Sequence, residues 1–239
     1  MTNPPNTRTL IGINVVAFTA MVLTGVSPLA PSPVELLHWG ANVGPLSLGP
    51  QPWRLLVSNY LHVGIIHLGL NMWCLWNLGL LAERIFEPWS YFLIYTACGL
   101  AGSLASLLGH PMAVGVGASG AIFGLAGALI AALYLGRLPI PAPAIRGTLK
   151  SLVSFAGYNL LFGAAIPGID NLAHIGGFLT GLALGAALAK SLLARPEARA
   201  SRRHGVFLVA AIALTMGFIL VKRVSGPRPR PLAGSDNIR

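Results

Sequence analysis

The sequence predicts an all-α polytopic membrane protein. Of its 239 residues, 54% are hydrophobic and 9% are charged, whereas about 25% of an average soluble domain is charged. Several apolar runs also approach the roughly 20 residues that a helix needs to cross a bilayer. These two observations exclude an ordinary soluble domain and make helix packing in lipid the central structural question.

Seven apolar segments are expected to form helices, at about residues 10–26, 63–82, 89–108, 118–135, 149–166, 171–189 and 206–221. The first is expected to be a retained helix, because no basic region or clear cleavage site marks a signal peptide. A long connection, 27–62, is rich in Pro and Gly and is expected to lie at the membrane interface.

The chain is accordingly divided into a short cytoplasmic N-terminus, a main transmembrane domain, a basic cytoplasmic loop, an additional transmembrane helix and a disordered basic tail. The respective ranges are 1–9, 10–193, 194–205, 206–221 and 222–239. Cys74 and Cys98 lie inside apolar segments and are expected to be small buried side chains, not a disulfide.

The positive charge predicts an orientation. The formal net charge is +10, but the basic residues lie between apolar segments without interleaved aromatics, which argues against nucleic-acid binding. With the N-terminus inside, the inner connections hold Arg84, Arg137, Arg146, Lys190 and the cluster from Arg195 to Arg203, as the positive-inside rule favours. Seven spans would leave the basic tail outside, so either that is tolerated or the last segment does not span.

Three reactive side chains share one depth in this arrangement. The second, fourth and sixth segments all start on the outer side, and His67, Ser119 and His174 each lie within about two helical turns of those starts. All three are therefore expected in the outer half of the membrane.

Ser119 is the candidate nucleophile, because a serine hydroxyl becomes reactive when a neighbouring base takes its proton. His174 is the candidate base, as the one histidine within the later membrane segments. Small residues spaced four apart let the two helices approach closely; they are Gly120 and Gly124 in one segment and Gly177, Gly181 and Gly185 in the other. The alternative is that these glycines only pack helices and Ser119 bonds to its own helix.

His67 and Asn71 lie four residues apart, and therefore on one helical face. Both can donate hydrogen bonds to the oxyanion of an acyl-transfer reaction, with the Ser119 backbone N–H as a third donor. The alternative is that the pair only links helices by hydrogen bonds. Asp170 either orients His174 or caps the sixth segment, and the cap is favoured. Phe123, one turn after Ser119, would then pack on the His174 ring.

No metal or cofactor is expected, because no HExxH pattern is present and no carboxylate lies near His62, His67 or His174 that would complete a zinc site. Glu83 and Arg84 are expected to make structural ion pairs or hydrogen bonds where the second segment ends. Trp53 is a candidate interfacial anchor, and Arg54 can bond the backbone of the long connection.

Together these motifs resemble the rhomboid family of intramembrane serine proteases. The matching residues, in family order, are Trp53-Arg54, His62, His67 with Asn71, Glu83, Gly117-Ala118-Ser119-Gly120, and Ala173-His174 with Gly177 and Gly181. The resemblance covers residues 10–189 and implies a rhomboid-like core of six helices plus a seventh helix.

The resemblance also implies roles for these residues. Ser119 and His174 would form a catalytic dyad, and His67, Asn71 and the Ser119 amide would form the oxyanion site. The supporting residues would be Gly117, Phe123, Gly177, Gly181, Trp53, Arg54, Glu83 and His62. The fifth segment and the loop before Asn171 would gate the site.

The implied substrates are membrane proteins with one transmembrane segment, cleaved near its outer end. This protein itself is expected to be a multi-pass protein of the bacterial inner membrane, with the active site toward the outer face. The partners are thus transmembrane substrates and the lipid bilayer. The competing hypothesis is an inactive relative that binds transmembrane clients. A transporter is disfavoured because no internal repeat is visible.

Overall fold

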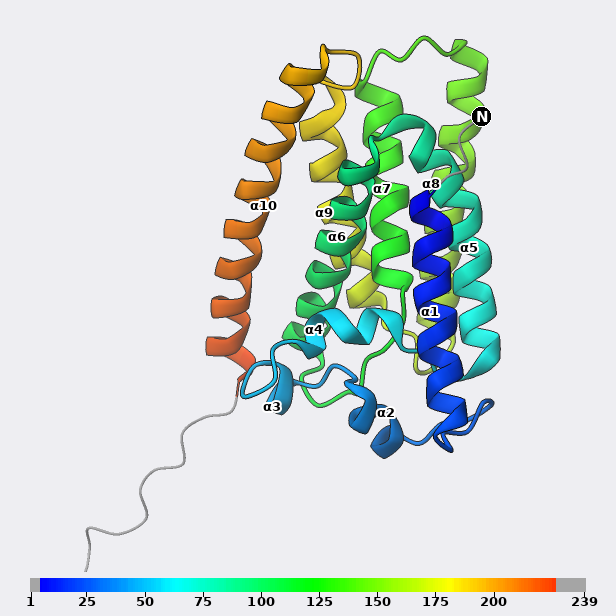
Figure 1. Ribbon diagram of the computed structural model, residues 1–239, viewed down its shortest axis with the longest axis vertical. Helices are drawn as coiled ribbons and strands as arrows, with labels where there is room; N and C mark the ends of the chain where they lie inside the picture. The colour runs from blue at the N-terminus through cyan, green and yellow to red at the C-terminus, as the bar shows by residue number, and fades with distance from the viewer. Residues whose placement is uncertain (1–4, 227–239) are drawn as a thin grey trace, which may run out of the picture.

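The computed structural model describes residues 5–226, which form seven long helices and several short ones. The long helices are α1 (Pro5–Leu23), α5 (Gly64–Ile85), α6 (Pro88–Gly109), α7 (Ser119–Leu135), α8 (Ala142–Ala165), α9 (Asn171–Ala189) and α10 (Pro196–Ser225). The short ones are α2 (Pro33–Trp39), α3 (Gly44–Ser47), α4 (Arg54–Val57) and the 3-10 turn η1 (Ser58–Tyr60). The long helices run side by side, and α2, α3 and α4 lie across one end of the bundle (Figure 1).

Each apolar segment expected from the sequence corresponds to one long helix, with ends that differ by a few residues, so the all-α polytopic architecture is confirmed. Five helices, α1, α5, α6, α9 and α10, are long and apolar enough to cross a membrane. Helix α7 is apolar but shorter, with 17 residues. Its length matches its position, because the chain reaches Ser119 only after an irregular segment that enters the end of the bundle.

Helices α1, α8 and α10 each begin several residues earlier than expected. Helix α8 starts at Ala142, ahead of the expected residue 149, and α10 starts at Pro196, ahead of residue 206. Most of the stretch 194–205, expected to be a loop, is therefore helical. Proline is well suited to the first turn of a helix, and the Ala and Arg residues after Pro196 are strong helix formers although they are not all apolar.

The two predicted terminal segments are described only in part. Residues 5–9 belong to α1 and residues 222–225 to α10, so the helices extend into the stretches that were expected to be a short N-terminus and a disordered tail. Residues 1–4 and 227–239, where the rest of those predictions falls, lie outside the described residues.

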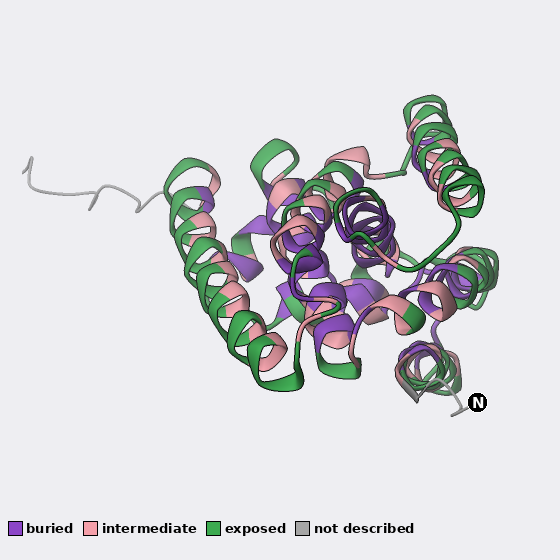
Figure 2. Cartoon of the chain, turned by 90° about the horizontal axis from the view of Figure 1, so that it is seen from above, coloured by how far each residue is buried: buried purple, intermediate pink, exposed green. Residues whose placement is uncertain are grey.

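Helix α7 forms the centre of the bundle. It packs against α5, α6, α8 and α9, and nearly every residue from Gly120 to Leu133 is buried. Seen from above, the buried residues gather in the middle of the bundle and the exposed residues on the outer helices (Figure 2). A side chain near the start of α7 is thus surrounded on all sides by other helices.

Glu83 makes one of the hydrogen bonds expected near the end of the second apolar segment. Its Oε1 accepts a hydrogen bond from the backbone N–H of Thr7 at 2.8 Å. The first turn of a helix has N–H groups without an intrahelical acceptor, so this carboxylate satisfies one of them in α1. The end of α5 is thereby tied to the beginning of α1.

The long connection between α1 and α5 is organised by Arg54. Its guanidinium donates to the carbonyls of Leu37 at 2.7 Å and Ala41 at 3.0 Å, and to Gln51 Oε1 at 2.6 Å. Arg54 is buried, and burial lowers the pKa of its guanidinium. The expectation that Arg54 bonds the backbone of this connection is confirmed, while Trp53 beside it stays half-exposed.

The connection also holds in place the segment that leads into α7. Asn42 and Gly115 pair as an antiparallel bridge, with backbone N–H to carbonyl distances of 2.9 Å in both directions. The N–H of Gly117 then donates to the carbonyl of Ser58 at 2.9 Å. Residues far apart in sequence therefore fix where Ser119 begins its helix.

Candidate active site

Ser119 is the first residue of α7 and lies at the helix N-terminus. The preceding Gly117 has φ of +132°, a backbone conformation that residues with a Cβ rarely adopt. This conformation turns the chain sharply into the helix. The serine is thus placed where the free N–H groups of the first turn and the positive end of the helix dipole act together.

His174 lies directly opposite Ser119. Its Nε2 is 2.9 Å from Ser119 Oγ, a hydrogen-bonding distance, and its side chain is 7% exposed. The structure therefore brings together the candidate nucleophile and the candidate base from α7 and α9. The alternative in which Ser119 bonds only to its own helix does not describe this geometry.

Asp170 caps α9, as favoured from the sequence. Its Oδ1 accepts the N–H of Ala173 at 3.0 Å. Within residues 5–226, the Nδ1 atom of His174 has no hydrogen-bond partner. The structure thus shows a serine–histidine pair and does not show an acid bonded to the histidine.

Glycines bring α7 and α9 into backbone contact. A Cβ atom built on Gly177 would overlap the carbonyl of Gly120, and one on Gly181 would overlap the carbonyl of Gly124. One turn further, Gly185 stands in the same way against Ala128. The expected close approach of these two helices is observed, and it is what allows the short Ser119 side chain to reach His174.

Phe123 packs against the face of the His174 ring. The two rings are stacked, with centroids 4.3 Å apart and planes inclined by 6°, as was expected for a residue one turn after Ser119. Phe123 also contacts Phe155 of α8, with ring centroids 5.5 Å apart. Phe155 was not identified from the sequence, because nothing in a helix of mixed polarity marks which aromatic faces the site.

His67 reaches the same place from α5. A Cβ atom on Gly117 would lie 2.8 Å from His67 Cε1, 3.1 Å from its Nε2 and 3.9 Å from Ser119 Oγ. Gly117 is therefore required by the close approach of the His67 ring, in addition to its positive φ. The backbone N–H of Val63 donates to His67 Nδ1 at 3.3 Å, which leaves Nε2 as the protonated nitrogen of the neutral ring.

Asn71 lies one turn along the same face of α5 and is buried. Its amide donates to the carbonyl of His67 at 2.9 Å, so in this structure the bond that it makes is within its own helix. Its expected role as an oxyanion donor is a prediction that this geometry does not test.

His62 supports His67 from the connection that precedes α5. Its ring is fully buried and meets His67 edge-on, with centroids 5.1 Å apart. Burial, and then the neighbouring His67, lower the pKa of His62 to about 3. The His62 ring is therefore neutral at physiological pH, and it packs against the His67 ring. Within the described residues no cluster of His, Cys, Asp and Glu has the arrangement of a metal site.

This fold and these residues define a multi-pass helical membrane protein with a serine–histidine pair at a helix N-terminus inside the bundle. A model of the rhomboid domain family matches residues 49–191, and the chain belongs to the rhomboid family. The match covers the site residues of α5, α7 and α9. The resemblance inferred from the sequence is thereby confirmed.

Curated proteins with related sequences agree. The chain is 34% identical to the rhomboid protease GluP of Bacillus subtilis over 216 residues, which are 90% of this chain and 40% of that protein. It is 39% identical to RHOMBOID-like protein 4 of Arabidopsis thaliana over 158 residues, 66% of this chain and 39% of that protein. It is 28% identical to the rhomboid protease AarA of Providencia stuartii over 232 residues, 88% of this chain and 80% of that protein. The chain thus spans about two fifths of the first two relatives.

Proposed function

We propose that this protein is an intramembrane serine endopeptidase that cleaves membrane proteins with a single transmembrane segment by means of a Ser119–His174 dyad. The observation that carries the proposal is the 2.9 Å contact between His174 Nε2 and Ser119 Oγ at the start of α7. Membership of a family that includes the proteases GluP and AarA supports it.

In the proposed reaction, His174 Nε2 takes the Ser119 proton while Oγ attacks the peptide carbonyl. The negative oxygen that forms would accept hydrogen bonds from the Ser119 backbone N–H and from Nε2–H of His67, the ring nitrogen that faces the site. Asn71 would join them after releasing the His67 carbonyl. His174 then returns the proton to the leaving amine, and water hydrolyses the acyl-enzyme.

We further propose that the site faces the outer side of a bacterial inner membrane. Arg84, Lys190 and Arg195 lie at the end of the bundle opposite the start of α7. The positive-inside rule assigns that end to the cytoplasm. Ser119 would then lie in the outer half of the membrane, where water entering from that side can reach it.

The direct test compares wild type with Ser119→Ala and His174→Ala on a single-span substrate in liposomes. Removal of either dyad member is expected to reduce the cleavage rate by orders of magnitude, with the wild-type cut near the outer face. Folding of each variant is checked by its thermal transition. No cleavage by folded wild type across several substrates would instead support a client-binding protein, and equal cleavage by all three would reject the assigned residues.

Asp170→Asn distinguishes a dyad from a triad. Asparagine is as good an N-cap as aspartate, so the cap on Ala173 survives while the negative charge is removed. A dyad predicts a cleavage rate close to that of wild type, because the cap is kept and the lost charge has no part in the reaction. Loss of activity comparable with that of His174→Ala, in protein of normal thermal stability, would show that Asp170 acts as the acid.

A further inference from the structure

Helix α10 contacts the rest of the bundle at its two ends and, between them, through Val206, Phe207, Ala210 and Leu214, which pack against the main hydrophobic core. At its beginning, Arg199 and Arg203 form ion pairs with Glu87, at 3.4 Å and 3.1 Å, where α6 starts. At its other end, Val221 is 5% exposed and packs in a cluster with Leu104 and Leu107 of α6 and with residues of the long connection. Val221 is the buried residue of this 30-residue helix.

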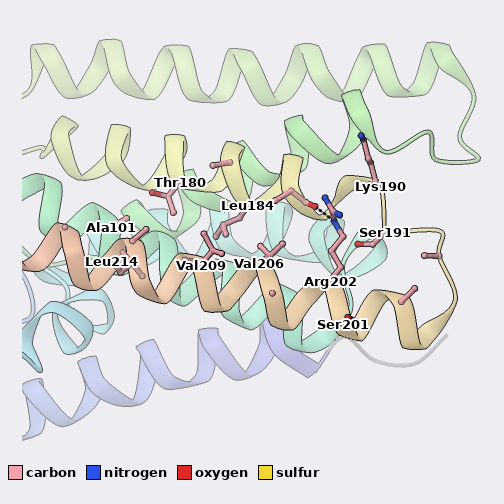
Figure 3. A pocket seen from close by; sticks show the side chains of 18 of the residues that line it. Ala101, Thr180, Leu184, Lys190, Ser191, Ser201, Arg202, Val206, Val209 and Leu214 are labelled. Carbon is pink, nitrogen blue, oxygen red and sulfur yellow. Dashed lines mark hydrogen bonds between the residues drawn. The ribbon is translucent and has the colours of Figure 1, made fainter.

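Between these attachments lies an elongated groove of 1230 Å³, bounded by α6, α9 and α10 (Figure 3). Small side chains line much of its length, among them Ala101, Ala183, Ala187, Gly205, Ala213 and Gly217. Thr180, Leu184, Val206, Val209 and Leu214 complete its apolar walls. The groove therefore arises because many of the facing residues are too small to fill the space between the three helices.

This space lies at membrane depth, so hydrocarbon and not water is its natural content. Apolar cavities do not hold water but accept apolar molecules, and empty space costs the dispersion contacts of the surrounding atoms. A transmembrane helix about 10 Å wide and 30 Å long has a volume of roughly 2400 Å³, about twice that of the groove. A lipid acyl chain is slender enough to enter it.

One end of the groove is basic. Arg202 lines it and is exposed, and its Nε donates to the carbonyl of Ala187 at 2.6 Å. Lys190 and Ser201 line the same end, although the Lys190 side chain points away from Arg202 (Figure 3). Arginine binds phosphate through paired N–H donors, and basic pockets between transmembrane helices are suited to anionic lipid headgroups.

We propose that the groove between α10 and the α6–α9 pair binds an anionic phospholipid, with an acyl chain along the alanine-lined walls and the phosphate on Arg202. The lipid fills the space that the packing of Val206, Ala210 and Leu214 leaves between α10 and the bundle. The proposal depends on the membrane location of the chain and is independent of its peptidase activity.

The headgroup is tested with purified protein in neutral detergent, titrated with phosphatidylglycerol or phosphatidylcholine, with bound lipid counted by native mass spectrometry. Wild type is expected to retain phosphatidylglycerol preferentially. Arg202→Gln is expected to weaken that binding about fivefold, the contribution of one basic side chain at an anionic surface, and to leave phosphatidylcholine binding unchanged. Arg223→Gln, the same charge removal at the far, exposed end of α10, is expected to change neither.

The acyl chain is tested with a matched pair of alanines. Both Ala211 and Ala213 are exposed on α10, but only Ala213 lines the groove. Ala213→Leu places three extra carbons in the lipid's path and is expected to reduce phosphatidylglycerol binding about tenfold, whereas Ala211→Leu is expected to bind as wild type does. Equal retention of both lipids by wild type, or equal effects within either variant pair, would overturn the proposal. In that case Arg202 serves only to cap the last turn of α9.

Discussion

Helix α9 meets its neighbours in two opposite ways. Toward α7 it presents Gly177, Gly181 and Gly185, and the two backbones are in contact. Toward α10 it presents Thr180, Ala183 and Ala187 across a groove. The difference shows that small residues do not by themselves create a tight contact. They permit one where both helices carry them in register, and they line a groove where the facing helices stand further apart.

This contrast matches the positions of the proposed catalytic residues. Ser119 and His174, the proposed dyad, lie on the tight side, where a displacement of about 1 Å would be enough to cost a large part of the rate. Nothing in the proposed reaction requires α10, so its contact with the bundle can be loose. The following predictions test the contrast, beginning with the largest expected effect.

Adding one methyl group at the tight contact is expected to have the largest effect. A Cβ on Gly181 overlaps the Gly124 carbonyl, so Gly181→Ala must separate α7 from α9 and is expected to cost about 3 kcal/mol of unfolding free energy or more. The control is Gly205→Ala on the loose side, where nothing lies within 4 Å of the added atom. Thermal unfolding in detergent should show Gly205→Ala to be neutral, or stabilising by up to about 1 kcal/mol. Similar losses in both variants would contradict the comparison.

Gly117→Ala is expected to have an intermediate effect on stability and a strong effect on activity. The positive φ costs an alanine on the order of 1–3 kcal/mol, and its Cβ would also displace the His67 ring. Gly25→Ala carries only the first cost, since Gly25 has φ of +96° with nothing within 4 Å. Unfolding measurements should therefore give the larger loss for Gly117→Ala, and cleavage should fall about a hundredfold for that variant alone. Normal cleavage by that variant would remove His67 from the proposed oxyanion site.

Glu87→Gln is expected to have the smallest effect. It removes the ion pairs with Arg199 and Arg203 at the start of α10, and the paired side chains are all partly exposed. Such pairs contribute about 0–1 kcal/mol, so unfolding of the bundle should change by no more than that and cleavage should be unaffected. A loss comparable with that of Gly181→Ala would mean that α10 contributes to the core as much as α9 does.

The sequence was sufficient for most of the site because its residues are marked by chemistry. His67, Ser119 and His174 are polar groups in apolar segments, and the glycines that let α7 meet α9 recur at helical spacing. Asp170 was correctly favoured as a cap because its position just before an apolar segment is typical of one. Phe155 carries no such mark, and its place beside Phe123 depends on how α8 packs.

The beginnings of α8 and α10 and the groove beside α10 were not predictable in the same way. An apolar run in the sequence indicates which residues lie in lipid. A helix can also include Arg and Ala residues outside the bilayer, as α10 does directly after Pro196. The groove depends on how α10 packs against α6 and α9. Glu87 with Arg199 and Arg203 is a contact across more than 100 residues, and no local pattern reveals such a pairing.

The bond between Glu83 and Thr7 has a consequence for the order in which the chain is assembled. The caps made by Ser32 and Asp170 join residues three positions apart, so each can form as soon as its own helix does. The first turn of α1 instead depends on a carboxylate that is 76 residues further along the chain. A ribosome completes α1 long before it supplies Glu83. The beginning of the first helix is therefore finished only after the second long helix has crossed back to meet it, and its hydrogen exchange would report that return.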